Sequence, residues 1–309
     1  MAGILIFSDK TNLALELLTA ANSISSSNGD IKAVTINNDE QAQALSEAGA
    51  NVYRINAAEL ILADVSAVAA ALGQAAAELG SDIILLSSNR RGKELAGRLA
   101  QVIGAGCLTD VNSLEAADGK TTCNRNALGG ATVANQYLKA DKQVIAIAPK
   151  SFTPAAGGSG SINDLSVEVK PSAVKLLEVK TKAGDSVDIE AAEVLVAVGQ
   201  GLNSKDDLAM VEELAKLLGG EVACSKPVAT DKKWLSEDRV IGLSGKICKP
   251  QLAIILGISG QVQFTVGIRD AKTIVSINTD ENATINSLSD YVLTTDLHEA
   301  VKAMNAALK

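Results

Sequence analysis

Short apolar runs alternate with helix-like segments along the first hundred residues of this chain. The runs are GILIF at 3–7, IKAVTIN at 31–37, NVYRI at 51–55 and DIILLSS at 82–88. Between and after these runs, apolar side chains recur at helical spacing, as in Leu95, Leu99 and Val102. Nearly continuous apolar strands that alternate with helices are typical of a parallel sheet with both faces covered. The alternation therefore predicts an α/β fold.

The pattern changes between about residue 106 and residue 190. The stretch TTCNRNALGGATVANQYL predicts two strands joined by a Gly-Gly turn, and QVIAIAP predicts a further strand. Residues 151–164 are rich in Gly, Ser and Pro, which predicts an exposed loop.

A second α/β alternation begins near residue 192. Its strongest helix is KDDLAMVEELAKLLG, with Leu208, Val211 and Leu214 on one face and Gly219 as a stop. Five apolar runs follow, EVACS, VIGLSG, AIILGISG, TIVSINTD and YVLTTD, which we interpret as strands, and a last helix closes the chain. The restart predicts two domains, 1–190 and 191–309, each a mostly parallel sheet flanked by helices.

Composition excludes several classes of function. The 309 residues carry a formal charge of −8, which argues against nucleic acid or an anionic membrane as the main partner. Four dispersed cysteines and a single histidine argue against a structural zinc site and against a disulfide framework, and we expect buried, free cysteines. The N-terminus lacks the pattern of a secretory signal, and no apolar run approaches a membrane span. We therefore expect a cytoplasmic protein.

The dipeptide Ser-Gly occurs twice where an apolar run stops, at Ser244-Gly245 and at Ser259-Gly260. In an open parallel sheet, ligands bind outside the carboxyl ends of the strands. Glycine there allows close approach of the backbone, and serine adds a hydroxyl donor. Both sites could therefore surround one phosphorylated ligand, although two ordinary turns explain the spacing equally well.

Other candidate motifs carry less information. VGQGL at 198–202 is a glycine turn after a strand, but it is not a complete dinucleotide-binding fingerprint. We find no Walker motif, nucleophile elbow or metal-spaced cluster. His298 is expected to face solvent at the start of the last helix, and Trp234 is expected to be a packing anchor rather than a platform for a ligand.

Four blocks of the second half together carry a family resemblance. They are SKP before a Trp, GLSGK followed by a Pro, GISGQVQ, and INTD at a strand end. Over residues 195–309 the chain resembles the C-terminal flavin domain of the electron transfer flavoprotein alpha subunit. The first half is similar to the same family in RGKELAGRLAQVIGAGCLTDV and ALGGATVANQ.

The resemblance implies a flavodoxin-like C-terminal domain that holds FAD. It also implies a heterodimer with a beta subunit, which the N-terminal domain would contact. Family members carry electrons from dehydrogenases to a quinone oxidoreductase or another acceptor. The chain is thus expected to be a redox carrier rather than a substrate-converting enzyme, and the flavin supplies the redox chemistry.

The resemblance also assigns cofactor-binding residues by position. They are Gln200, Ser225, Lys226, Ile241, Gly242, Leu243, Ser244, Ser259, Gly260, Gln261, Val262, Gln263, Phe264, Asn278, Asp296 and Leu297. Three of them depart from the family pattern: Gln200 and Lys226 each replace an arginine, and Phe264 replaces a histidine. Phe264 can donate no hydrogen bond to a negatively charged flavin, so we expect these departures to change the redox tuning of FAD.

Two other functions stay open on the sequence. A degenerate alpha-like subunit could hold a nucleotide only structurally, as an assembly scaffold; the three departures favour this alternative, and the retained Gln263, Ser259 and Asn278 oppose it. A free-standing nucleotide-dependent enzyme would need a catalytic constellation, and the sequence shows none that we can name.

Overall fold

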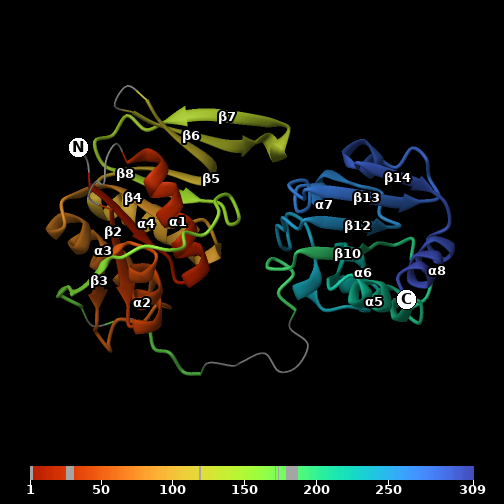
Figure 1. Cartoon of the computed structure of the whole chain (residues 1–309), viewed down its shortest axis with the longest axis horizontal. Helices are drawn as coiled ribbons and strands as arrows, with labels where there is room; N and C mark the ends of the chain where they lie inside the picture. The colour runs from red at the N-terminus through yellow and green to blue at the C-terminus, as the bar shows by residue number, and fades with distance from the viewer. Residues whose placement is uncertain (1–2, 26–30, 118–119, 171, 173, 179–186) are drawn as a thin grey trace. The chain divides into compact units, whose positions relative to one another are not determined.

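A computed structural model describes residues 3–25, 31–117, 120–170, 172, 174–178 and 187–309 (Figure 1). The chain divides into two compact units, residues 1–179 and residues 180–309. Each unit is an α/β structure built on its own sheet, as the sequence predicts. No helix in the described part of the chain is long and apolar enough to cross a membrane.

The sheet of unit 1 has nine strands in the order β7-β6-β5-β8-β4-β1-β2-β3-β9. The elements are β1 Gly3–Phe7, α1 Thr11–Ile24, β2 Ile31–Ile36, α2 Asp39–Glu47, β3 Asn51–Ile55, α3 Val65–Glu78, β4 Ser81–Ser87, α4 Arg90–Ile103, β5 Gly106–Ala117, β6 Lys120–Ala127, η1 Leu128–Gly130, β7 Thr132–Tyr137, β8 Gln143–Ile147 and β9 Ser161–Asp164. All described pairings are parallel except those of β6 with β5 and with β7.

Two apolar layers cover the central strands of unit 1. Alternate residues of β1 show the division: Leu5 and Phe7 pack with α3 and α4, whereas Ile4 and Ile6 pack with α1 and α2. Since successive side chains of a strand point to opposite faces, both faces of the sheet are buried. This explains why the run GILIF is apolar at nearly every position.

The antiparallel edge of unit 1 confirms the predicted hairpin. Strands β6 and β7 pair from Thr122 with Tyr137 to Ala127 with Thr132, and the turn between them contains Gly129 at a φ of 65°. The prediction of a loop over 151–164 is wrong at its end, where β9 pairs with β3. All four side chains of β9 are exposed, so the sequence shows no apolar pattern there. The strand is held instead by backbone pairing and by the ion pair between Arg54 and Asp164 at 2.8 Å.

Unit 2 contains five parallel strands in the order β11-β10-β12-β13-β14. Its elements are β10 Val194–Val198, α5 Leu208–Leu217, β11 Glu221–Cys224, α6 Lys226–Thr230, η2 Glu237–Arg239, β12 Leu252–Leu256, α7 Val262–Thr265, β13 Thr273–Asn278, η3 Thr284–Leu288, β14 Tyr291–Thr294 and α8 Leu297–Ala307. In chain order this is the 2-1-3-4-5 arrangement of flavodoxin-like folds, which confirms the predicted class.

The core of unit 2 also lies on both faces of its sheet. Val196 and Ile254 pack on the side of α5, α6 and α8, and Leu195 and Ile255 pack on the side of α7 and η3. Helix α5 buries Leu208, Val211, Leu214 and Ala215, the face that the helical periodicity predicts.

One predicted strand of unit 2 is wrong. The run VIGLSG at 240–245 makes only isolated bridges, between Cys224 and Val240 and between Ile241 and Lys246. It forms a turn in which the Gly245 N–H donates to the Gly242 carbonyl at 3.0 Å. Ser244 therefore lies in this turn rather than at the end of a strand.

Candidate functional site

The carboxyl ends of the strands of unit 2 surround a pocket of about 850 Å³. The segments after β10, β11, β12, β13 and β14 all contribute to its wall, together with the turn at 241–244. This is the end of an open parallel sheet at which ligands bind, and the volume is in the range of about 300–1,000 Å³ that is usual for ligand sites. We call this cavity the strand-end pocket.

Most of the residues that the sequence assigns to the cofactor line the strand-end pocket. They are Gln200, Ser225, Lys226, Ile241, Ser244, Ser259, Gln261, Gln263, Phe264, Asn278, Asp296 and Leu297. Four others do not line it: Gly242, Leu243, Gly260 and Val262. The side chains of Leu243 and Val262 are 62% and 60% exposed to solvent.

The two predicted glycines outside the lining shape the loops that form the wall. A side chain at Gly242 would place its Cβ 2.2 Å from the Gln263 carbonyl oxygen, and one at Gly260 would place its Cβ 2.2 Å from the Ile285 nitrogen. Their φ angles are 131° and 90°, which L side chains rarely adopt. Glycine is therefore required at both positions for the backbone segments to pack together.

Another close approach joins the loops after β10 and β12. The Gly201 N–H donates to the Gly257 carbonyl at 3.0 Å, and a Cβ at Gly201 would lie 2.7 Å from the Gly257 Cα. On the neighbouring strand, the Asn278 side chain donates to the Ile258 carbonyl at 3.1 Å and accepts from the Asp280 N–H at 3.1 Å. These contacts fix adjacent strand ends relative to one another.

The strand-end pocket contains hydrogen-bonding groups that the protein itself does not use. Within the described residues, the hydroxyls of Ser225, Ser244 and Ser259 have no protein partner, and neither do the Lys226 ammonium and the Gln263 amide. Three hydroxyls, a cation and an amide are donors for a ligand that carries phosphates and hydroxyls. This donor set fits a phosphorylated dinucleotide such as FAD.

The charged groups of the lining are one cation, Lys226, and three carboxylates, of Asp231, Asp280 and Asp296. Each carboxylate already accepts a local hydrogen bond, for example from the Asn282 N–H to Asp280 at 2.9 Å. Carboxylates can also accept from ribose hydroxyls, as they do in other dinucleotide sites.

Sequence reasoning missed several lining residues. These are Gly201, Asn203, Pro227, Thr230, Asp231, Gly257, Ile258, Thr279 and Asp280. Most lie within three residues of a predicted position, in the same loop. Extending each predicted site along its strand-end loop would have found them, because parallel strands end at one edge of the sheet.

Two of the departures from the family pattern have clear structural settings. Phe264 is only 6% exposed and belongs to the core beside Ile241 and Ile285, so it lines the strand-end pocket from within that core. The backbone carbonyl of Gln200 accepts from the Lys232 ammonium at 3.3 Å, and this ammonium lies 4.2 Å from the centre of the Trp234 ring. Trp234 packs against the core, as predicted.

His298 lies at the start of α8, as expected, but its ring faces solvent only in part. Its side chain is only 24% exposed, and its two ring nitrogens face two carboxylates, Nε2 at 2.9 Å from Asp207 and Nδ1 at 3.2 Å from Asp296. Hydrogen bonding to Asp207 raises the pKa of His298 above its usual 6.5, although burial opposes this effect. Asp207 directly precedes α5 and is 91 residues before His298 in the chain. The local sequence around His298 therefore does not predict the ion pair between them.

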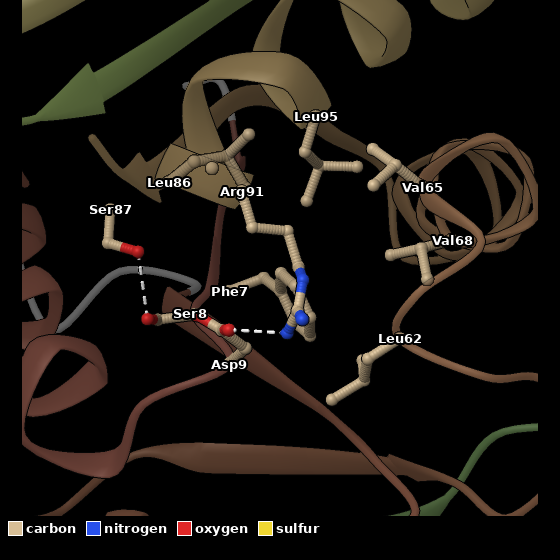
Figure 2. Close-up of a pocket in the computed structure, with 11 residues that line it drawn as sticks. Phe7, Ser8, Asp9, Leu62, Val65, Val68, Leu86, Ser87, Arg91 and Leu95 are labelled. Carbon is tan, nitrogen blue, oxygen red and sulfur yellow. Dashed lines mark hydrogen bonds and ion pairs between the residues drawn. The ribbon is translucent and has the colours of Figure 1, made fainter. Parts of the chain in front are cut away.

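A much smaller hollow, of about 10 Å³, lies at the strand ends of unit 1 (Figure 2). It occurs at the ends of β1 and β4, where the strand order reverses. Arg91 pairs with Asp9 across it at 2.7 Å, and the hydroxyls of Ser8 and Ser87 are 2.8 Å apart. The protein's own side chains fill this position, which leaves room for no more than about one water.

Family comparison supports the assignment of both units. Residues 188–269 match the electron transfer flavoprotein FAD-binding domain, and residues 9–170 match the electron transfer flavoprotein domain. Among solved structures, glycosyltransferase VinC in complex with dTDP aligns over 100% of this chain and 94% of its own, with 11% identity and a TM-score of 0.31. A score this low supports no conclusion about fold or function.

Curated relatives align with the chain from end to end. Protein FixB of Escherichia coli O17:K52:H18 is 31% identical over 98% of this chain and 97% of its own length. Protein FixB of Shigella flexneri has the same identity and coverage. Together with the two domain matches and the strand-end pocket, these similarities show that the chain belongs to the electron transfer flavoprotein family, as an alpha subunit.

Proposed function

We propose that this alpha subunit binds FAD in the strand-end pocket of unit 2 and uses it to carry electrons. When bound, FAD supplies the redox chemistry, and the protein supplies orientation and local charge. Lys226 and the hydroxyls of Ser225, Ser244 and Ser259 are the groups that we expect to hold the polar parts of the cofactor. Ile241, Leu297 and the buried Phe264 provide apolar surface.

One observation carries the proposal: polar groups that have no partner in the described part of the protein converge from separate strand ends on one pocket. A hydroxyl or ammonium that has no protein partner is free to bind a ligand without first breaking an internal hydrogen bond. The alternative of a purely structural scaffold is not favoured, because Lys226 and the hydroxyls of Ser225, Ser244 and Ser259 have no partner among the described residues, despite the departures from the family pattern.

The family forms heterodimers with a beta subunit, and we propose that unit 1 of this chain contacts it. Unit 1 exposes large apolar side chains around the β6–β7 hairpin, with Leu128 at 82%, Val133 at 67% and Tyr137 at 45%. Exposed apolar groups of this kind are typical of interaction surfaces. A stable partner is expected to bury at least roughly 1,200 Å² in total.

We further propose that the electrons come from a dehydrogenase and pass to a quinone oxidoreductase or another acceptor, and that the complex works in the cytoplasm. These finer assignments rest on the family resemblance. Capture of the donor with the purified complex, followed by flavin reduction on addition of the donor's substrate, would test the first of them.

The direct test of FAD binding is the visible absorption spectrum of this chain purified with its beta subunit. After gel filtration, the complex is expected to carry flavin absorbance. Two substitutions test whether FAD binds in the strand-end pocket. Ser259→Ala in this pocket should weaken FAD binding, whereas Ser8→Ala in the filled hollow of unit 1 should not. A colourless complex, or equal effects of the two variants, would count against the proposal.

A further inference from the structure

The single histidine of the chain connects two loops that line the strand-end pocket. His298 lies in the first turn of α8 and forms the middle of a bridge with Asp207 and Asp296, at 2.9 Å and 3.2 Å. We call these three side chains the His298 bridge. The family assignment does not use it.

Both ends of the His298 bridge lead directly into the pocket wall. Asp296 lines the pocket itself, beside Leu297, and caps α8 by accepting from the His298 N–H at 2.8 Å. Asp207 also accepts from the Ser204 N–H at 3.1 Å, and Ser204 follows Asn203, which lines the pocket. The bridge thus ties the loop after β10 to the loop after β14.

The chemistry of imidazole makes this connection depend on protonation. A neutral ring has one N–H donor, whereas the imidazolium has two. Because both ring nitrogens face carboxylates, both hydrogen bonds form only when His298 carries a proton. Loss of the proton places a nitrogen lone pair against a carboxylate oxygen at one end of the bridge.

The surrounding charged groups determine whether His298 is protonated. Asp207 precedes α5 and Asp296 precedes α8, and α8 itself carries Glu299 and Lys302 next to His298 and one turn further on. Lys302 also acts on Asp207, and β13, which packs against α8, has no titratable side chain. Helix α5, which also packs against α8, carries Glu212, Glu213 and Lys216, and Glu213 pairs with Lys309 at the far end of α8 at 2.7 Å. The N-terminal end of the α8 dipole disfavours a cation, but the two adjacent carboxylates favour it, and the pKa of His298 is raised.

We propose that His298 is a positioning residue for FAD: its protonated form fixes the loops after β10 and β14, so FAD binds more tightly below the His298 pKa than above it. This inference rests on the proposed binding of FAD in the strand-end pocket. His298 does not line that pocket, and it acts through Asp296 and through the loop at Asn203 and Ser204.

The first test measures FAD affinity between about pH 6 and pH 9. The full chain is kept in complex with its beta subunit, FAD is removed, and rebinding is followed by quenching of flavin fluorescence. We expect the wild type to bind FAD about twofold to fivefold more weakly at high pH than at low pH. A change of this size is what one partly exposed charge pair contributes. His298→Gln should bind at the weaker level throughout.

A matched variant separates charge from packing. Arginine is charged at every pH used and can reach both carboxylates, so His298→Arg should keep the tighter binding at high pH. If His298→Gln retains the pH profile of the wild type, or if the wild-type affinity does not change with pH, the proposal is wrong. A complex that binds no FAD at any pH overturns both this inference and the proposed function.

The second test observes the histidine itself. The chain is labelled with ¹³C-histidine and combined with unlabelled beta subunit, so that the spectrum contains one histidine signal. Reciprocity of linked equilibria requires FAD to raise the His298 pKa by an amount that matches the change in affinity. An unchanged His298 pKa on addition of FAD would overturn the proposal even if every variant folds normally.

Discussion

The loop after β12 allows a prediction with a magnitude that can be worked out from the structure. Gly260 is buried in this loop between the pocket-lining Ser259 and Gln261, at a φ of 90°. In Gly260→Ala, the added Cβ would lie 2.2 Å from the Ile285 nitrogen, whereas ordinary contact begins at 3.4 Å. Ile285 would have to move by 1.2 Å, the difference between these two distances.

That movement has two energetic consequences. The Ile285 N–H donates to the Ser259 carbonyl at 3.0 Å, and loss of this bond leaves a buried donor unpaired, at a cost of about 1–3 kcal/mol. Alanine at this φ adds strain of about 1–3 kcal/mol. We therefore expect Gly260→Ala to lower the free energy of unfolding of unit 2 by about 2–6 kcal/mol and to disrupt FAD binding.

Gly219 provides a matched control in the same unit. Its φ is 65°, but a Cβ there would meet nothing within 4 Å. Gly219→Ala should therefore show only the backbone strain, about 1–2 kcal/mol, and should keep FAD affinity.

The measurement is urea unfolding of the FAD-free chain, followed by fluorescence of Trp234. This residue is the only tryptophan and packs against the core of unit 2. If Gly260→Ala is no less stable than Gly219→Ala, the close approach to Ile285 does not govern this loop, and the reasoning is refuted.

Further predictions concern charge, redox tuning and partner contact. Without FAD, the unfolding free energy of unit 2 should fall as the pH rises above about 6.5, because folding raises the pKa of His298. It should also fall as the pH drops below about 3.8, because folding lowers the pKa of Asp296, chiefly through the hydrogen bond from the His298 N–H. Urea midpoints across pH check this, and a flat profile would contradict it. Lys226→Ala should weaken FAD binding about fivefold, as measured by flavin fluorescence; unchanged affinity would mean that Lys226 does not contact the cofactor. Phe264→His should raise the midpoint potential of bound FAD by roughly 60–130 mV, the equivalent of one hydrogen bond to a charged group, and Phe264→Leu, which adds no donor, should not; potentiometric titration distinguishes them. Val133→Asp should weaken the heterodimer in analytical ultracentrifugation, whereas a charge at the exposed Val102 on α4 should not.

The sequence alone predicts most of the regular elements of both units and the end of the sheet at which the pocket forms. Strands β1 and β12 and helix α5 follow from apolar patterns that are local in the chain. The pocket position follows because parallel strands end at one edge. Ser259 therefore lies in the pocket lining at the strand end where the local pattern places it, and the family resemblance added Asn278 and the residues in the neighbouring loops.

Only the tertiary structure decided features that depend on contacts between distant segments. Strand β9 is held by pairing with β3, and Ser244 lies in a turn packed against residues after β12, so neither has a sufficient local signal. The orientation of Phe264 into the core depends on packing with Ile241 and Ile285. His298 acquires its partners because α5 and α8 lie side by side in the fold, bringing two carboxylates to a ring that the sequence predicts to face solvent.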